Sequence, residues 1–149
     1  MKIAIGSDHA ALEQKQHLVE KLKRDGHEVI DVGTHTIESC DYPEPARDVA
    51  RKVASGEAER GILCCGTGIG VCIAANKVKG IRAAVVHNDF TASAAGSHND
   101  ANVLCLGGRV LTHEQAARLV DIWLKTPFEG GRHQRRIDKI TEIEKEECG

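Results

Sequence analysis

The chain has 149 residues, and its 20 Lys and Arg nearly balance its 22 Asp and Glu. This length suits one domain, residues 1–149, with a sizeable core, and the charge balance offers no basic surface for nucleic acid or an anionic membrane. The apolar runs are strand-sized, so no membrane span is predicted, and the N-terminal stretch MKIAIGSDHA is typical of a strand rather than a signal peptide.

Five apolar runs predict β-strands, and helical patterns separate them. The strands are expected at Lys2–Ser7, Glu28–Val32, Gly61–Cys65, Ile81–His87 and Val103–Leu106. Most of these runs are continuous rather than alternating, which suits strands that are covered on both faces. Strict alternation of strand and helix indicates right-handed crossovers. The predicted fold is therefore α/β, a three-layer Rossmann-like arrangement around a five-stranded parallel sheet.

The helices between these strands are expected at about residues 11–24, 43–53, after a glycine-rich stretch at 66–70, at 88–96 and from 112 onward. Asp89 is expected to cap the fourth of them, and Thr112 with Gln115 has the spacing of a capping box. An extra C-terminal helix carries a narrow apolar stripe made of Ile137, Ile140 and Ile143. We expect this stripe to pack across an edge of the molecule or onto a partner subunit.

The six cysteines lie at positions 40, 64, 65, 72, 105 and 148, and none of them forms a Cys-x-x-Cys pair. Several lie inside apolar patterns, where a free cysteine behaves as a small hydrophobic residue. This spacing favours neither a structural zinc site nor a disulfide framework. We therefore expect reduced cysteines, no bound metal and a cytoplasmic protein.

The glycine-rich stretch Gly66–Gly70 joins the third predicted strand to a helix. An ATP-binding P-loop is excluded, because Lys77 follows the glycines too late. A dinucleotide-binding loop is an alternative, since Asp89 follows at about 20 residues, although the glycines are spaced Gly-x-Gly-x-Gly rather than Gly-x-Gly-x-x-Gly. A tight turn that binds no ligand is the third interpretation.

Chemically useful side chains follow two of the predicted strands. The first strand ends in Ser7-Asp8-His9 and the third in Cys65-Gly66-Thr67. If these strands are neighbours, an acid, an imidazole, a thiol and several backbone N–H groups converge where ligands of parallel sheets bind. A helix N-terminus at this place favours anions and thiolates. These groups suit proton transfer beside a carbonyl, with the Cys65 thiolate as base and the N–H groups of residues 66–70 as an oxyanion hole. That chemistry needs no cofactor.

Five separated motifs carry a family resemblance. They are SDH at 7–9, DYP at 41–43, CGTGIG at 65–70 with IAANK at 73–77, HND at 98–100 and EGGRHQRR at 129–136. In this order they resemble the type B ribose-5-phosphate isomerases, almost from end to end. The resemblance implies an aldose–ketose isomerase that interconverts ribose 5-phosphate and ribulose 5-phosphate through an enediolate. It also implies a homodimer or a tetramer.

The resemblance assigns roles to individual residues. Cys65 is expected to accept the proton, His98 to open the furanose ring, and Asp8 and Thr67 to assist. The residues expected to bind the substrate are Asp8, His9, Tyr42, Gly66, Thr67, Gly68, Ile69, Gly70, Asn99, Arg109, Arg132 and Arg136. Arg132 and Arg136 are four residues apart, so one helix face presents both to a phosphate. Tyr42 equally suits a place as the cap of a loop.

Two positions qualify this resemblance. One branch of the family uses a glutamate of the glycine loop as its base, but Val71 stands there, so the cysteine branch applies. Cys64 replaces a residue that is usually aliphatic. Because strand side chains alternate, we expect Cys64 to point to the face opposite Cys65.

Two rival functions remain. Allose-6-phosphate and galactose-6-phosphate isomerases resemble the same family, and a non-catalytic phosphosugar sensor could use the same loop. A sensor has no need of Cys65, so that thiol favours an enzyme. The active site is expected to be shared between subunits, because His98 and Asn99 precede the fifth strand whereas Cys65 lies at the carboxyl end of the third.

Overall fold

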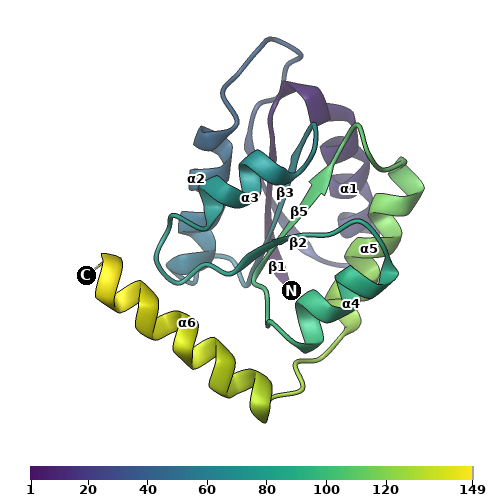
Figure 1. The fold of residues 1–149 in the computed structure, drawn as a ribbon. Coiled ribbons are helices and arrows are strands. Elements are labelled where there is room, and N and C mark those ends of the chain that lie inside the picture. The colour runs from purple at the N-terminus through teal and green to yellow at the C-terminus, as the bar shows by residue number, and fades with distance from the viewer. Residues whose placement is uncertain (149) are drawn as a thin grey trace.

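The computed structural model describes residues 1–148 and is a three-layer α/β fold (Figure 1). The strands are β1 (Lys2–Ser7), β2 (Glu28–Gly33), β3 (Arg60–Cys65), β4 (Ala83–Val85) and β5 (Val103–Gly107). They form one sheet in the order β2-β1-β3-β5-β4, with every pair parallel. The predicted five-stranded parallel sheet is confirmed, and β1 and β3 are neighbours, as the convergence of their ends requires.

The helices are α1 (Leu12–Arg24), α2 (Pro43–Ala54), α3 (Ile69–Ala75), α4 (Asp89–Ser97), α5 (His113–Lys125) and α6 (Arg132–Cys148), and a short 3-10 turn, η1 (His9–Ala11), precedes α1. Apolar residues of α1, α4 and α5 pack on one face of the sheet, and those of α2 and α3 on the other (Figure 1). Thr112 and Gln115 form the predicted capping box of α5. Because β1, β3 and β5 are adjacent and parallel, their carboxyl ends lie side by side between the two helical layers.

Neighbouring cysteines of β3 belong to different cores. Cys64 packs in the layer of α1 and α5, where it is completely buried, and Cys65 packs in the layer of α2 and α3. The predicted opposite orientation is confirmed, and it follows from the alternation of side chains along a strand.

The region around β4 differs from the prediction at two places. The strand is shorter than the run 81–87, because the Arg82 N–H donates to Asn102 Oδ1 over 2.8 Å and the His87 N–H donates to Thr91 Oγ1 over 3.0 Å, outside the ladder of the sheet. The expectation that Asp89 caps α4 is wrong. The preceding residue, Asn88, has the extended backbone of an N-cap and its side chain accepts the Thr91 N–H.

The C-terminal helix α6 begins at the end of the sheet opposite the carboxyl ends of the strands, at the lower side of the molecule in Figure 1. Ile137 is buried, whereas Ile140 and Ile143 are 50% and 59% exposed. They line an open groove of about 460 Å³ together with Arg82 and Asn99. The apolar stripe is thus only partly covered. Within residues 1–148, no helix is long and apolar enough to cross a membrane.

Candidate active site

β3 carries Cys65 to the carboxyl edge of the sheet, where the thiol meets the glycine loop. The Gly68 N–H donates to Cys65 Sγ over 3.2 Å. Gly68 has φ +81, and a Cβ there would lie 2.9 Å from the Leu106 carbonyl carbon, so the turn requires glycine. An N–H group that donates to sulfur stabilises the thiolate, the form of cysteine that acts as a base or nucleophile.

The remaining N–H groups of the loop divide into two sets. The Ile69 N–H donates to Thr67 Oγ1 over 3.1 Å. The N–H groups of Gly68 and Ile69 therefore both donate to acceptors within residues 65–67. Within residues 1–148, the N–H groups of Gly66, Thr67 and Gly70 donate to no protein acceptor. These three are therefore free to stabilise an oxyanion next to Cys65.

The end of β1 places an acid and an imidazole beside this loop. The Asp8 N–H donates to Cys64 O over 3.2 Å, and Asp8 Oδ1 caps η1 by accepting the Ala10 N–H. His9 Nδ1 accepts the Cys40 N–H over 3.1 Å. Because Nδ1 is an acceptor here, the hydrogen of a neutral His9 ring lies on Nε2, which is left to donate to a ligand.

Two further side chains cover the loop. Arg109 follows β5, its N–H donates to Gly66 O over 3.0 Å, and a Cβ on Gly66 would lie 3.4 Å from the Arg109 guanidinium. The Tyr42 ring rests on Gly70, where a Cβ would be only 2.6 Å from the ring. The predicted residues Asp8, His9, Tyr42, Cys65 and Arg109 thus gather with Gly66, Thr67, Gly68, Ile69 and Gly70 at one edge of the sheet.

The remaining predicted residues lie at the opposite end of the sheet, near the amino ends of the strands. His98 is the C-cap residue that follows α4, and its N–H donates to Ala94 O over 2.9 Å. Asn99 follows, and its carbonyl accepts Arg82 Nε over 3.2 Å. Arg132 and Arg136 occupy the first two turns of α6, and both are exposed. Neither guanidinium has a hydrogen-bond or ion-pair partner within residues 1–148.

The structure adds two residues to this second group. The His133 ring stacks on the His98 ring with centroids 4.4 Å apart, and His133 Nε2 lies 3.3 Å from Glu129 Oε2. The sequence places His133 in a run of cations, which suggests a solvated face, yet the side chain is buried. The spacing of Glu129 and His133, four residues apart, is the only sign of the pair in the sequence.

The other thiols of the core differ in ionisation. Burial raises the pKa of the Cys64 thiol far above its usual range. A hydrogen bond from Cys105 lowers the pKa of Cys72 to about 7, whereas burial raises that of Cys105 well above its ordinary value. Of the two adjacent cysteines on β3, therefore, Cys64 is held as the neutral thiol and only Cys65 meets the loop.

The structure does not place Asp89 where a dinucleotide-binding loop would need its ribose-binding acid. β5 lies between β3 and β4, so Asp89 does not follow a strand adjacent to the glycine loop. Its carboxylate instead pairs with Arg118 over 2.7 Å. Asp89 is therefore not placed to serve as the ribose-binding acid of a dinucleotide-binding loop.

Comparison with known proteins agrees with this geometry. Residues 3–140 match the model of the family described as Ribose/Galactose Isomerase. The chain is 50% identical over 143 residues to ribose-5-phosphate isomerase B of Escherichia coli, and the match covers 96% of each chain. Its fold matches the structure of ribose-5-phosphate isomerase B of Clostridium thermocellum with a TM-score of 0.97 and 55% identity, covering 98% of this chain and 99% of that one.

A further solved structure is that of ribose-5-phosphate isomerase B of Mycoplasma genitalium with bound ribulose-5-phosphate, with a TM-score of 0.94, 50% identity and 97% coverage of both chains. These matches span nearly the whole chain, at identities far above those at which only the fold is shared. The chain therefore belongs to the ribose/galactose isomerase family, with the type B ribose-5-phosphate isomerases, and is an aldose–ketose isomerase.

Proposed function

We propose that this enzyme interconverts D-ribose 5-phosphate and D-ribulose 5-phosphate through an enediolate, with Cys65 as the general base. The observation that carries the proposal is the hydrogen bond from the Gly68 N–H to Cys65 Sγ, beside three N–H groups that have no other acceptor. A proton acceptor and an oxyanion hole are the two groups that an enediolate mechanism needs. The ribulose-5-phosphate bound to the Mycoplasma genitalium relative supports this choice of substrate.

The proposed reaction begins with the furanose ring. His98 takes the proton of the anomeric hydroxyl, the bond between C1 and the ring oxygen breaks, and the ring oxygen gains a proton, so that an aldehyde and a free hydroxyl form. The Cys65 thiolate then removes the proton from C2. The N–H groups of Gly66, Thr67 and Gly70 stabilise the enediolate oxygen that results.

The second half of the reaction restores a carbonyl. The hydroxyl proton passes from O2 to O1, and the Cys65 thiol returns its proton to C1, which gives the ketose and regenerates the thiolate. Thr67 Oγ1 accepts the Ile69 N–H, so its own O–H is available to a substrate oxygen. Asp8 and His9 face the same place from the end of β1, and His9 presents Nε2 as a donor.

The phosphate of the substrate is proposed to bind Arg132 and Arg136, with Asn99 beside them. Both guanidinium groups are exposed, lack a protein partner within residues 1–148 and lie four residues apart on α6, so that they present a pair of forked donors. They belong to the same edge of the sheet as His98.

We further propose that each active site is built from two subunits of a homodimer. Cys65 lies at the carboxyl end of β3, whereas His98 precedes the amino end of β5, and Gly61 pairs with Val103 and Cys65 with Gly107 along the two strands. A strand of about five residues separates these ends by about 17 Å, too far for one small sugar. A two-fold axis that brings the His98 edge of one subunit to the Cys65 edge of the other would form two complete sites.

The direct test is steady-state kinetics of ribose 5-phosphate beside allose 6-phosphate, with Cys65→Ala and Cys64→Ala as a matched pair. We expect ribose 5-phosphate to be the better substrate. Loss of a general base lowers turnover by about 10²–10⁴-fold, so Cys65→Ala should lose that factor while it still binds phosphosugar.

The adjacent variant is the control for this test. Cys64→Ala should keep its turnover and lose only stability, on the order of 1 kcal/mol, because Cys64 packs in the opposite core. Equal losses of turnover in two folded variants would refute Cys65 as the base. A clear preference for allose 6-phosphate would refute the proposed substrate.

A further inference from the structure

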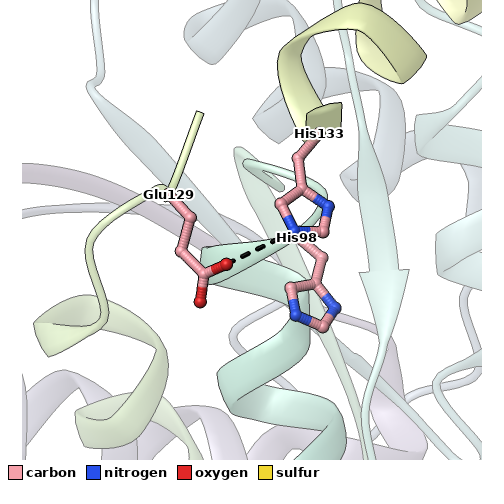
Figure 2. Close-up of side chains that lie close together, drawn as sticks. All are labelled: His98, Glu129 and His133. Carbon is pink, nitrogen blue, oxygen red and sulfur yellow. Dashed lines mark ion pairs between the residues drawn. The ribbon is translucent and has the colours of Figure 1, made fainter. Parts of the chain in front are cut away.

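The segment before α6 and the end of α4 bring together three side chains, of which the proposed mechanism uses only His98 (Figure 2). The His133 ring is 6% exposed, and it stacks on the His98 ring with centroids 4.4 Å apart and planes inclined by 9°. Its Nε2 lies 3.3 Å from Glu129 Oε2. His133 is therefore held between a carboxylate and a parallel imidazole.

The backbone joins the same residues. The Glu129 N–H donates to Ser97 O over 3.1 Å, next to His98 in the chain, and the His98 N–H donates to Ala94 O. The contacts thus form a closed path from α4 to the segment of Glu129, on to His133 in α6, and back to His98 through the stacked rings. Of the three side chains, His133 contacts both of the others.

A metal centre is one interpretation of this cluster, since one ligand atom of each side chain lies within 4.8 Å of the others. The orientation of the rings argues against it. The lone pairs of two parallel, stacked imidazoles lie in parallel planes and do not converge on one ion at the distance of about 2.0–2.1 Å that a Zn–N bond requires. Stacking instead suits one ring that holds the orientation of another.

We propose that His133 and Glu129 are positioning residues for His98, an inference that rests on the role of His98 in the proposed function. The Glu129 carboxylate lies at ion-pair distance from His133 Nε2, and this contact, together with burial of the ring, restrains how the His133 ring lies. Stacking on His133 in turn restrains the plane of the His98 ring. Within residues 1–148 the His98 ring makes no hydrogen bond of its own, so the stack sets its orientation.

The orientation matters because one imidazole serves two oxygen atoms of the furanose. It removes a proton from the anomeric hydroxyl, and the ring oxygen, which is released as the bond to C1 breaks, gains a proton. A displacement of a catalytic group by 1 Å can cost about 100-fold in rate. Loss of the stacked partner should therefore slow ring opening and leave the chemistry at Cys65 untouched.

The experiment measures these two steps separately in the whole enzyme. Turnover of ribose 5-phosphate requires ring opening. Exchange of the C1 hydrogens of ribulose 5-phosphate with D₂O, followed by proton NMR, does not, because the hydroxyl that would close a five-membered ring on C2 carries the phosphate. We expect His133→Ala to lower ribose 5-phosphate turnover by about 10- to 100-fold and to leave hydrogen exchange within about threefold of wild type.

Conservative variants supply the rescue. His133→Phe keeps a flat ring on His98 but loses the contact with Glu129, so its turnover should exceed that of His133→Ala and match that of Glu129→Leu. Glu129→Leu removes the carboxylate beside His133 and should lower turnover by about 3- to 10-fold, a smaller effect than loss of the ring itself. Glu129→Gln keeps a polar side chain of the same shape and should retain more turnover than Glu129→Leu. Gln134→Leu is the control, because it removes an exposed bond to Asp138 on the same helix.

Turnover and exchange that fall by one common factor in His133→Ala and Glu129→Leu would overturn the inference, as would wild-type turnover in either. If His133→Ala does not fold, Glu129→Leu decides, since the Glu129 side chain is 58% exposed. Different results would refute the proposed function. Hydrogen exchange that persists in Cys65→Ala would refute the base, and normal ring opening in His98→Ala would refute the role of His98.

Discussion

Residues next to one another in this chain have different chemistry because the backbone sends them to different surroundings. Cys64 lies in a closed core, where burial raises the pKa of its thiol, whereas the sulfur of Cys65 accepts a loop N–H. On α6, His133 is buried while Arg132 on one side and Arg135 beyond are exposed. Side-chain direction therefore gives similar neighbouring residues different surroundings.

The run of cations on α6 makes this selection testable. Arg132→Ala and Arg136→Ala should each raise the Michaelis constant and weaken inhibition by inorganic phosphate by about 10- to 100-fold, because a hydrogen bond to a charged group contributes about 1.5–3 kcal/mol. Some loss of turnover is also expected, since binding energy remote from the chemistry helps to reach the transition state.

Arg135→Ala is the matched control, as it removes an exposed cation from the same turn of α6. It should leave the inhibition constant of phosphate within about twofold, since single exposed charges contribute little. The same loss in all three variants would mean that phosphate responds only to the net charge of the helix. An unchanged inhibition constant in Arg136→Ala would remove that residue from the phosphate site.

At the scale of elements, the glycine loop depends on what α2 and β5 place against it. Gly68 has a backbone conformation that suits glycine, and Gly70 leaves room for the Tyr42 ring just before α2. Tyr42 is 42% exposed, so its ring can move away when that room is filled. The Tyr42 ring can therefore lie against the loop only because residue 70 has no side chain.

This fit predicts how two substitutions combine. Gly70→Ala should push the Tyr42 ring aside, and if Tyr42 lines the sugar site, as proposed, the Michaelis constant for ribose 5-phosphate should rise by about the same factor as in Tyr42→Ala. In the double variant the effects should not multiply, because the first change already removes the contact. Independent, multiplying losses would show that Gly70→Ala damages the loop itself rather than the position of Tyr42.

At the scale of the whole molecule, sequence patterns correctly predicted the features that follow from strand geometry. Continuous apolar runs located the strands, and alternation placed Cys64 and Cys65 on opposite faces. What they missed depends on contacts between distant segments. The Asn102 side chain limits β4 by binding the Arg82 N–H, and the stack of His133 on His98 joins two helices whose packing no local pattern reveals. Asn88 rather than Asp89 caps α4 because its backbone is extended, which composition alone does not distinguish.

The same strand geometry leads to the central claim, that residues at opposite ends of one sheet act on one sugar only when two subunits meet. The most direct measurement mixes inactive Cys65→Ala and His98→Ala proteins, unfolds and refolds them together, and assays ribose 5-phosphate isomerisation. Random pairing makes half of the dimers mixed, and each mixed dimer has one of its two sites intact, so activity should return to about a quarter of wild type. If mixed dimers demonstrably form and the mixture stays inactive, the active site lies within one chain and the claim is contradicted.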